Sequence, residues 1–391
     1  MAHSKPIKLP NEVIYLIFDA FYDSLDASEG REDIMTSFYL HSLICKRLRD
    51  YCCKYAFRNG VQLGPLNARR YFQIPLENAL QLLKDNSRLA LHVKRVKFRF
   101  RPEDYSVMSI SHNRTSTWLA KQAEFANIVE LKDLSIHCKV SSQKSIAYES
   151  SSPNESLGYR MILERSFKTL ATLSLSNIAE VPILFILSST PHLVTLNLEG
   201  CAFVKGETAL DQLSTSKITR LSLKCTPDTA SDNILKYCAE TLQSLALCYE
   251  ISAEPEYVDN TELCFKNLLY LSLDIVKLSP AQQQFFKSTL LGTSSSLTSL
   301  EIECAYPDDD LSRQLELLDR RLNELPHFQA MEWGFSTDEA NPETLLDEDE
   351  KQDLRQCLND FVISIKKEMP KLDEAKKLTF KNNITSSTLA V

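Results

Sequence analysis

The chain has 391 residues, 43% of them hydrophobic and 25% charged, and it carries a formal net charge of −8. A single hydrophobic core stops growing at roughly 250–300 residues, so this length requires several domains or a repeat architecture, and the ordinary composition excludes wholesale disorder. The negative charge gives no electrostatic basis for binding nucleic acid, and with only 8 glycines, loops that cradle phosphate are disfavoured.

The sequence IKLPNEVIYLIFDAF at residues 7–21 predicts a helix. Pro10 lies near the first position of this helix, where the missing N–H of proline costs little. On that helix Glu12, Tyr15 and Asp19 form one polar stripe, and nearly every other side chain is apolar. The helical segment that follows can cover only one side. About fifty residues cannot enclose such a helix alone, so we expect some of its apolar surface to bind another chain.

The two ends of this N-terminal module resemble the F-box family. That family opens with Leu-Pro-x-Glu and an apolar helix, and closes with a sequence similar to Ser-Leu-Val-Cys-Lys-Arg-Trp. The matching residues are Leu9, Pro10, Glu12, Val13, Ile17 and Phe18 at the start, and Ser42, Leu43, Ile44, Cys45, Lys46 and Arg47 at the end. The chain departs from the family at Leu48, where an aromatic residue is usual, and in an acidic insert at 23–33. The alternative is a pair of helices that cap the repeats described below.

An F-box implies a small all-α domain that docks on the linker subunit of a cullin-RING ubiquitin ligase, and through that subunit on the cullin. We place the domain at residues 1–58, followed by a helical lead-in at 59–88. The residues that the resemblance assigns to docking, or to supporting the docking surface, are Leu9, Pro10, Glu12, Ile14, Ile17, Phe18, Leu43 and Cys45.

The rest of the chain repeats one apolar pattern, an anchor followed three and five residues later by two more. Clear copies begin at Val93, Leu131, Leu170, Leu193, Ile218, Leu242, Leu268 and Leu297, and weaker copies begin at Phe328 and Ala375. From Leu170 to Leu297 the first anchors are 23, 25, 24, 26 and 29 residues apart. The last two anchors alternate with polar residues, as a strand buried on one face requires. Helical patterns lie between copies at 181–190, 231–240 and 280–291.

The period and the Leu-x-x-Leu-x-Leu core resemble leucine-rich repeats, in which each unit contributes a strand and a helix and neighbouring units stack. The resemblance implies an α/β repeat fold at residues 89–391, a horseshoe-shaped solenoid of about nine to ten irregular repeats. A Ser-rich insert at 139–157 interrupts it, and an acidic insert with a C-terminal cap at 337–391 ends it. The alternative is an ordinary α/β domain with a parallel sheet, whose elements would not share an anchor spacing.

If the anchors face a core, the residues between and beside them line the concave face of the solenoid. The candidate substrate-binding residues at these positions are Arg95, Lys97, Arg99, Arg220, Lys224, Glu301 and Glu303. The face is therefore expected to run from basic at the front to acidic at the back. The basic start suits an acidic or phosphorylated protein segment, because a guanidinium group pairs with two phosphate oxygens. The alternative is a row of solvated charges without a ligand.

Together the two resemblances imply a substrate-recognition adaptor of an SCF-type cullin-RING E3 ubiquitin ligase, which holds a protein substrate near an active site on other subunits. The alternative is a leucine-rich-repeat scaffold or inhibitor that acts by protein binding without ubiquitination. The chain is not expected to be an enzyme or to hold a metal or cofactor, since it lacks G-x-S-x-G, Walker and H-E-x-x-H motifs.

The cysteines and the apolar runs predict where the protein resides. The 11 cysteines are odd in number and never form a C-x-x-C, which indicates reduced thiols in the cytoplasm, the nucleus or both. There is no apolar run of 18 residues and no apolar signal segment, so neither a membrane span nor secretion is expected. The acidic run Asp308–Asp310 is interpreted as a solvated turn rather than a metal site.

Overall fold

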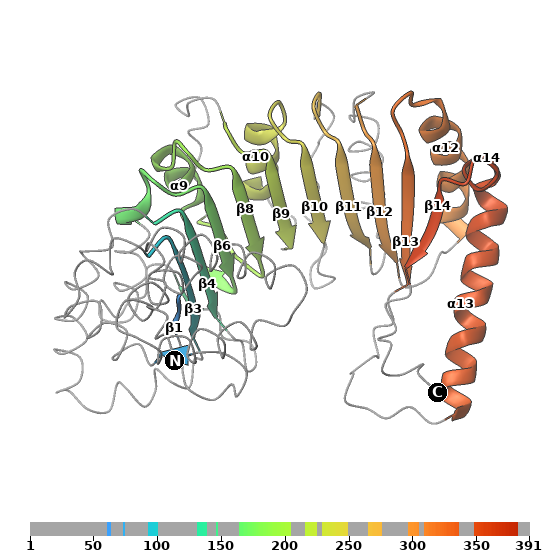
Figure 1. Cartoon of the computed structure of the whole chain (residues 1–391), viewed down its shortest axis with the longest axis horizontal. Helices are drawn as coiled ribbons and strands as arrows, with labels where there is room; N and C mark the ends of the chain where they lie inside the picture. Colours follow the sequence, from blue (N-terminus) through green and yellow to red (C-terminus); the bar gives the residue numbers. More distant parts are fainter. Residues whose placement is uncertain are drawn as a thin grey trace, which may run out of the picture. The chain divides into compact units, whose positions relative to one another are not determined.

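The computed structural model describes residues 61–63, 73–74, 93–100, 131–138, 146–147, 164–204, 216–224, 229–248, 265–275, 296–304, 309–335 and 348–381. The chain divides into two compact units, Met1–Leu170 and Ala171–Val391. The second unit contains most of the described residues and all of the elements that form the candidate site below (Figure 1).

The second unit is built on a parallel β-sheet whose strands lie side by side in chain order (Figure 1). Its strands are β6 (Thr172–Ser176), β8 (Thr195–Glu199), β9 (Arg220–Lys224), β10 (Ser244–Cys248), β11 (Tyr270–Ile275), β12 (Ser299–Cys304), β13 (Ala330–Phe335) and β14 (Leu378–Lys381). A two-residue strand, β7 (Ile178–Ala179), follows β6 outside this sheet. Parallel neighbours need a crossover connection of a dozen or more residues, which accounts for the spacing of the repeated pattern.

The apolar anchors form two continuous rows across this sheet. The first row consists of Leu173, Leu196, Leu221, Leu245, Leu271, Leu300 and Met331, and the second of Leu175, Leu198, Leu223, Leu247, Leu273, Ile302 and Trp333, each residue in register with the next. All of these side chains are at most 4% exposed, so the prediction that these anchors face a core is confirmed. On β14 the corresponding Leu378 and Phe380 are only half-buried, because no further described strand covers them.

Backbone hydrogen bonds also join the segments that lead into the strands. The amide of Val194 donates to the carbonyl of Ala171 at 2.8 Å, and the amide of Thr219 donates to the carbonyl of Val194 at 2.9 Å. The same bond recurs at the amides of Gln243, Leu269, Thr298 and Gln329. Two hydroxyls just before a first anchor bond to the preceding copy, Thr241 Oγ1 to the Ile218 carbonyl and Ser296 Oγ to the Leu268 carbonyl. Each copy therefore satisfies buried polar groups of its neighbour, which fixes the register.

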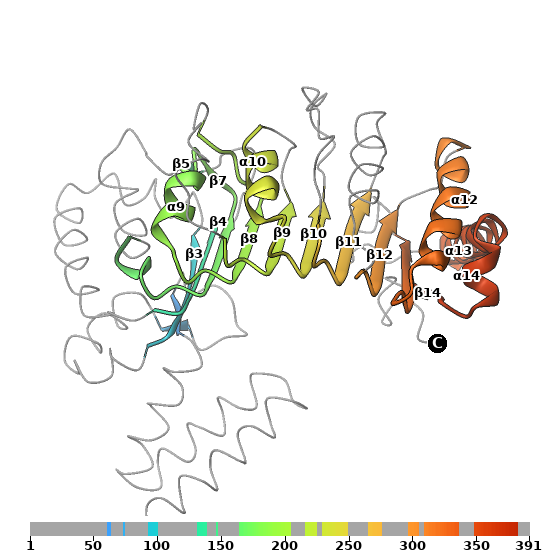
Figure 2. The same cartoon turned by 90° about the horizontal axis from the view of Figure 1, so that it is seen from above.

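Helices cover the anchor side of this sheet (Figure 2). They are α9 (Ile183–Ser189), α10 (Thr229–Cys238), α12 (Asp309–Glu324), α13 (Glu348–Glu368) and α14 (Pro370–Glu374). The helices predicted at 181–190 and 231–240 are confirmed as α9 and α10, while 280–291 lies outside the described residues. The buried side chains of α9 and α10 include Ile183, Ile186, Ile234 and Leu235.

Helix α12 shows that the interpretation of the acidic run at 308–310 as a turn was wrong. Asp309 and Asp310 lie in the first turn of this helix, where the helix dipole favours negative charge. Its buried residues Leu315, Leu318 and Leu322 recur at the i, i+3 and i+7 positions of an amphipathic helix. That periodicity was present in the sequence and was overlooked in favour of the turn.

Helices α13 and α14 are attached to the rest of the second unit by contacts that include the following two. The ring of Phe361 meets the ring of Trp333 edge to face, with centroids 6.1 Å apart and planes at 73°. The second contact is between α12 and α14, where the buried carboxylate of Asp319 accepts the backbone amides of Lys371 and Leu372. These contacts attach the C-terminal helices to β13 and α12.

A tight turn after β8 requires glycine. Gly200 has φ of 57°, a conformation that costs other residues about 1–2 kcal/mol. A side chain at this position would also overlap Oδ1 of Asn177, which itself has φ of 58° after β6. Asparagine tolerates this conformation better than most residues because its short polar side chain can bond locally. The two stacked turns thus end neighbouring strands in the same way.

The first unit contains a smaller described part. Its strands are β1 (Val61–Leu63), β2 (Gln73–Ile74), β3 (Arg95–Phe100), β4 (Asp133–Cys138) and β5 (Ile146–Ala147). The parallel pairs are β1–β2, β1–β3 and β3–β4. The short strand β5 lies inside the segment 139–157, which was interpreted as a Ser-rich insert without regular structure. The strands of the first unit thus pair in parallel, and the second unit combines parallel strands with helices, in agreement with the predicted α/β class. Separately, no described helix is long and apolar enough to cross a membrane.

Candidate functional site

The face of the second unit's sheet opposite the helices carries three rows of mostly polar side chains, here called the polar face. The first row is Thr172, Thr195, Arg220, Ser244, Tyr270, Ser299 and Ala330. The middle row is Ser174, Asn197, Ser222, Ala246, Ser272, Glu301, Glu332 and Thr379. The third row is Ser176, Glu199, Lys224, Cys248, Asp274, Glu303, Gly334 and Lys381. Because strand side chains alternate between faces, these rows lie opposite the buried anchors.

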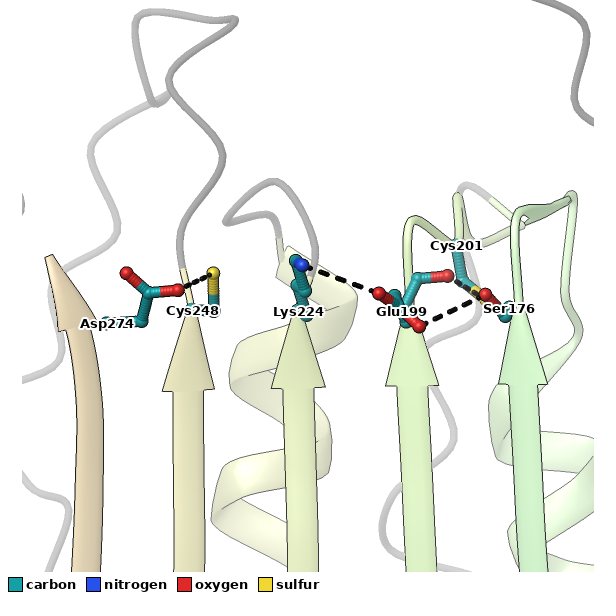
Figure 3. A network of polar contacts seen from close by, with 6 residues as sticks. All are labelled: Ser176, Glu199, Cys201, Lys224, Cys248 and Asp274. Carbon is teal, nitrogen blue, oxygen red and sulfur yellow. Dashed lines mark hydrogen bonds and ion pairs between the residues drawn. The ribbon is translucent and has the colours of Figure 1, made fainter. Parts of the chain in front are cut away.

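The third row holds two sets of polar contacts at the carboxyl ends of five adjacent strands (Figure 3). Ser176 Oγ donates to Glu199 Oε2 at 3.2 Å, and Lys224 Nζ lies 3.4 Å from Glu199 Oε1. Farther along, the thiol of Cys248 donates to Asp274 Oδ2 at 2.9 Å. Partial burial lowers the pKa of Lys224, but Cys248 and Glu199 outweigh it and the pKa is raised overall. Lys224 is therefore a cation paired with the carboxylate of Glu199.

Two buried cysteines, Cys201 and Cys238, have thiols of low reactivity. Burial raises the pKa of the Cys201 thiol to about 11 and that of Cys238 to about 12. The Sγ atom of Cys201 lies 3.5 Å from the carbonyls of Leu175 and Glu199, so it links β6 to β8 (Figure 3). The thiolate is the reactive form of cysteine, and these two residues are consequently structural.

Across β11, β12 and β14 the polar face holds a second cluster, centred on Glu301. The hydroxyl of Tyr270 donates to Glu301 Oε2, and Lys381 Nζ lies 3.4 Å from Glu301 Oε1. Burial would raise the pKa of Glu301, but the Tyr270 hydrogen bond and the Lys381 charge lower it overall. Burial and the hydrogen bond to Glu301 raise the pKa of Tyr270 to about 12. At neutral pH the cluster is a carboxylate held by a neutral phenol and an ammonium group.

Alkaline pH is expected to weaken the fold through Tyr270. Because its folded pKa of about 12 exceeds the ordinary value of 10.0, its contribution to stability is complete below pH 10 and is lost as the pH rises toward 12. The variant Tyr270→Phe should lose about 1 kcal/mol of unfolding free energy at pH 8 through the missing hydrogen bond. Urea unfolding between pH 8 and pH 11.5 should show this difference shrinking, while a difference independent of pH would contradict the assignment.

The structure places four of the predicted substrate-binding residues on the polar face. Arg220 and Lys224 lie on β9, and Glu301 and Glu303 lie on β12, three strands farther along the sheet. Lys224 and Glu301 are each held by a partner of opposite charge. Arg220 is exposed and forms no ion pair with another described residue. These four residues therefore lie on one surface but do not form a single cluster.

The basic residues predicted at the front of the repeats lie in the first unit. Arg95, Lys97 and Arg99 belong to β3, and Arg95 is in register with Asp133 on β4. Arg95 Nε lies 3.8 Å from Asp133 Oδ2, and burial nevertheless raises the pKa of Asp133 above its ordinary value. Part of the basic charge is therefore already neutralised within the protein, and the preference for an acidic or phosphorylated segment stays a prediction.

The predicted docking residues Leu9, Pro10, Glu12, Ile14, Ile17, Phe18, Leu43 and Cys45 lie outside the described residues. The proposed boundaries at residues 58 and 88 both fall within the first unit, Met1–Leu170. The role of these residues and the division of the N-terminal region remain predictions from the sequence.

Besides Cys248, which contacts Asp274, three more residues of the polar face were missing from the sequence prediction. Glu199, Tyr270 and Lys381 all carry contacts there. Glu199 and Lys381 directly follow the third anchor of their copies, the same position as Lys224 and Glu303, so the existing pattern would have found them. Tyr270 directly precedes the second anchor of its copy, as Arg220 does, so the position that predicted Arg220 would also have predicted Tyr270.

Among the described residues, no group of three or more His, Cys, Asp or Glu side chains is arranged to hold a metal ion. No protein-family model matches the chain, and no curated protein matches it either.

Proposed function

We propose that this protein is the substrate-recognition adaptor of an SCF-type cullin-RING E3 ubiquitin ligase. In this proposal residues 1–58 form an F-box that docks the linker subunit, and residues 89–391 form a leucine-rich-repeat solenoid of about nine to ten irregular repeats that binds a protein substrate. Chemistry occurs on other subunits, and the adaptor contributes proximity.

The observation that carries the repeat part of the proposal is the register of the second unit. Consecutive strands from β6 to β13 repeat the same pair of anchors, and the anchors stack row on row. The same backbone hydrogen bond recurs before most of these strands. Such a repeating, one-dimensional arrangement is typical of solenoids, which offer an extended face to other proteins. The F-box part is carried by the two-ended sequence match alone.

The alternative function is a repeat scaffold or inhibitor that binds a partner without ubiquitination. The scaffold would use the same polar face as the adaptor, and the two functions differ only in the role of the N-terminal helices. In the adaptor the apolar face of the first helix engages a separate subunit, whereas in the scaffold it caps the repeats.

The adaptor proposal predicts that the full-length chain captures the ligase linker subunit in a pull-down with purified proteins. The double variant Leu9→Asp/Ile17→Asp should lose this capture, because two charges would be placed in an apolar interface. A matched control is Leu317→Asp, which adds a charge at a side chain of α12 that is 65% exposed. The control should bind like the wild type, and circular dichroism should show all variants folded.

The outcome of this pull-down distinguishes the adaptor from the scaffold. Loss of capture in the double variant alone supports the adaptor, and a reconstituted ubiquitination assay with a bound partner then completes the test. If the wild type itself fails to capture the linker subunit, the F-box assignment fails and the scaffold function takes its place.

A further inference from the structure

The segments that lead into β8, β9, β10 and β11, with the first residue of each strand, form one margin of the second unit's sheet (Figure 1). They are residues 191–195, 216–220, 240–244 and 265–270, here called the amino margin. Backbone hydrogen bonds join each segment to the next. The charged residues of this margin are Lys217, Arg220, Lys266 and Glu240, so it has a net positive charge on a chain whose formal charge is −8.

Two of these cations lack a partner of opposite charge among the described residues. Lys266 Nζ lies 3.4 Å from Glu240 Oε1, so these two charges neutralise each other. Lys217 and Arg220 are exposed, and neither forms an ion pair with another described residue. Both belong to the segment that opens β9. A guanidinium group can bind both oxygens of a carboxylate, so this part of the margin is able to bind a carboxylate from a partner.

Two large apolar side chains are exposed in the same margin. Val194 is 40% exposed and Leu269 is 43% exposed, and each directly follows the first anchor of its copy. The amides of Thr219 and Arg220 donate to the Val194 carbonyl at 2.9 and 3.1 Å, so Val194 adjoins the segment with the two unpaired cations. Leu269 lies three strands farther along the sheet, a distance of about 14 Å. A partner that covers these apolar side chains gains free energy from their removal from water.

We propose that the amino margin binds an extended acidic segment of a partner protein, in which carboxylates lie between two apolar residues four positions apart. Four residues of an extended chain span about 13–14 Å, which matches the separation of Val194 and Leu269 across the strands. Residues at even spacing in such a chain point to the same side, so both apolar residues can face the margin. The inference rests on the proposed function insofar as this segment belongs to the substrate.

The charge of the margin favours this partner over two others. A second copy of this chain would bring the same cations together, because an isologous contact uses the same patch on both subunits. The net charge of −8 opposes a nucleic acid. An acidic segment with apolar residues can pair with Lys217 and Arg220 and also cover Val194 and Leu269, so it complements both features of the margin.

The test measures the fluorescence anisotropy of labelled peptides with the full-length chain at physiological salt, where charges more than about 8 Å apart are largely screened. The probe is fluorescein-Ser-Leu-Asp-Glu-Asp-Leu-Ser, and two reference peptides replace either its acidic residues by lysine or its leucines by serine. The probe should bind at least about tenfold more tightly than either reference. The net charge of the chain by itself favours the lysine peptide, so equal affinity or a preference for lysine would overturn the proposal. No ligase subunit is present, so this experiment and the linker-subunit experiment fail independently.

The decisive variant is Arg220→Glu, with Lys236→Glu as its matched control. Arg220→Glu should weaken probe binding about tenfold. Lys236 is exposed on α10, on the helical side of the sheet, and its reversal changes the net charge equally but should leave probe binding unchanged. Leu269→Ser should remove the advantage of the probe over the serine reference. All three positions are exposed, so the thermal midpoint of unfolding should not fall.

Equal weakening by Arg220→Glu and Lys236→Glu would show that only the overall charge matters and would overturn the proposal. Light scattering of the unlabelled chain addresses a second copy as the occupant, and it should give the same mass for the wild type and for Arg220→Glu. An oligomer of the wild type that Arg220→Glu dissociates would assign the amino margin to a second copy and would also overturn the proposal.

Discussion

Replacing Trp333 by alanine is expected to lower the free energy of unfolding by about 3–5 kcal/mol. Trp333 is 0% exposed and is the largest fully buried side chain among the residues that the structure describes. It fills the space between β13 and α13, where its ring meets Phe361. Truncation removes transfer free energy and leaves a cavity that the surrounding strands can only partly close. Urea unfolding followed by circular dichroism measures the loss.

A double-mutant cycle with Phe361→Ala isolates the contact between the two rings. An edge-to-face pair contributes about 0.5–1.5 kcal/mol beyond buried area, so the double variant should lose less than the sum of the single variants by that amount. The control is Ile363→Ala on the same helix, whose side chain is 64% exposed, and it should change stability by less than about 0.5 kcal/mol. Strict additivity would show that α13 does not depend on this contact.

The second large effect is expected at Asp319, which lies on α12 and is 2% exposed. Its Oδ1 accepts the amide of Leu372 at 2.9 Å, and its Oδ2 accepts the amide of Lys371 at 3.2 Å. Helix α14 has no side-chain cap of its own at Met369, so Asp319 satisfies two of its unpaired first-turn amides. Asp319→Ala should cost about 2–3 kcal/mol, because hydrogen bonds to a charged group are lost and a buried amide is left without a partner.

The variant Asp319→Asn distinguishes the hydrogen bonds from simple packing. The amide group has nearly the shape of the carboxylate but offers one acceptor oxygen, so it should recover part of the loss. Asp360→Ala is the matched control, because Asp360 is exposed on α13 and, within the described part of the chain, accepts a hydrogen bond only from the side chain of Gln356. Thermal unfolding in which Asn and Ala variants are equally unstable, or in which the control is as unstable as either, would contradict the capping role.

The local periodicity of the sequence was sufficient to predict the strands of the second unit and the face that each one buries. Anchors three and five residues apart alternate with polar residues, and this pattern depends only on the geometry of a strand. The helices at α9 and α10 followed from the same kind of periodicity. Helix α12 was missed because an acidic run after proline was assigned to a turn, although Leu315, Leu318 and Leu322 carried the helical signal.

The tertiary structure alone decided which polar residues meet. Lys381 pairs with Glu301 across 80 positions of sequence, and Glu332 lies opposite Glu301 only through the register of β12 and β13. Sequence spacing does not determine that register, because the connections between strands differ in length. It is set by the packing of buried anchors and by backbone hydrogen bonds between neighbouring copies. The sequence by itself therefore determined which residues are candidates for the polar face. The packed sheet determined which of these residues contact one another and which like or opposite charges lie side by side.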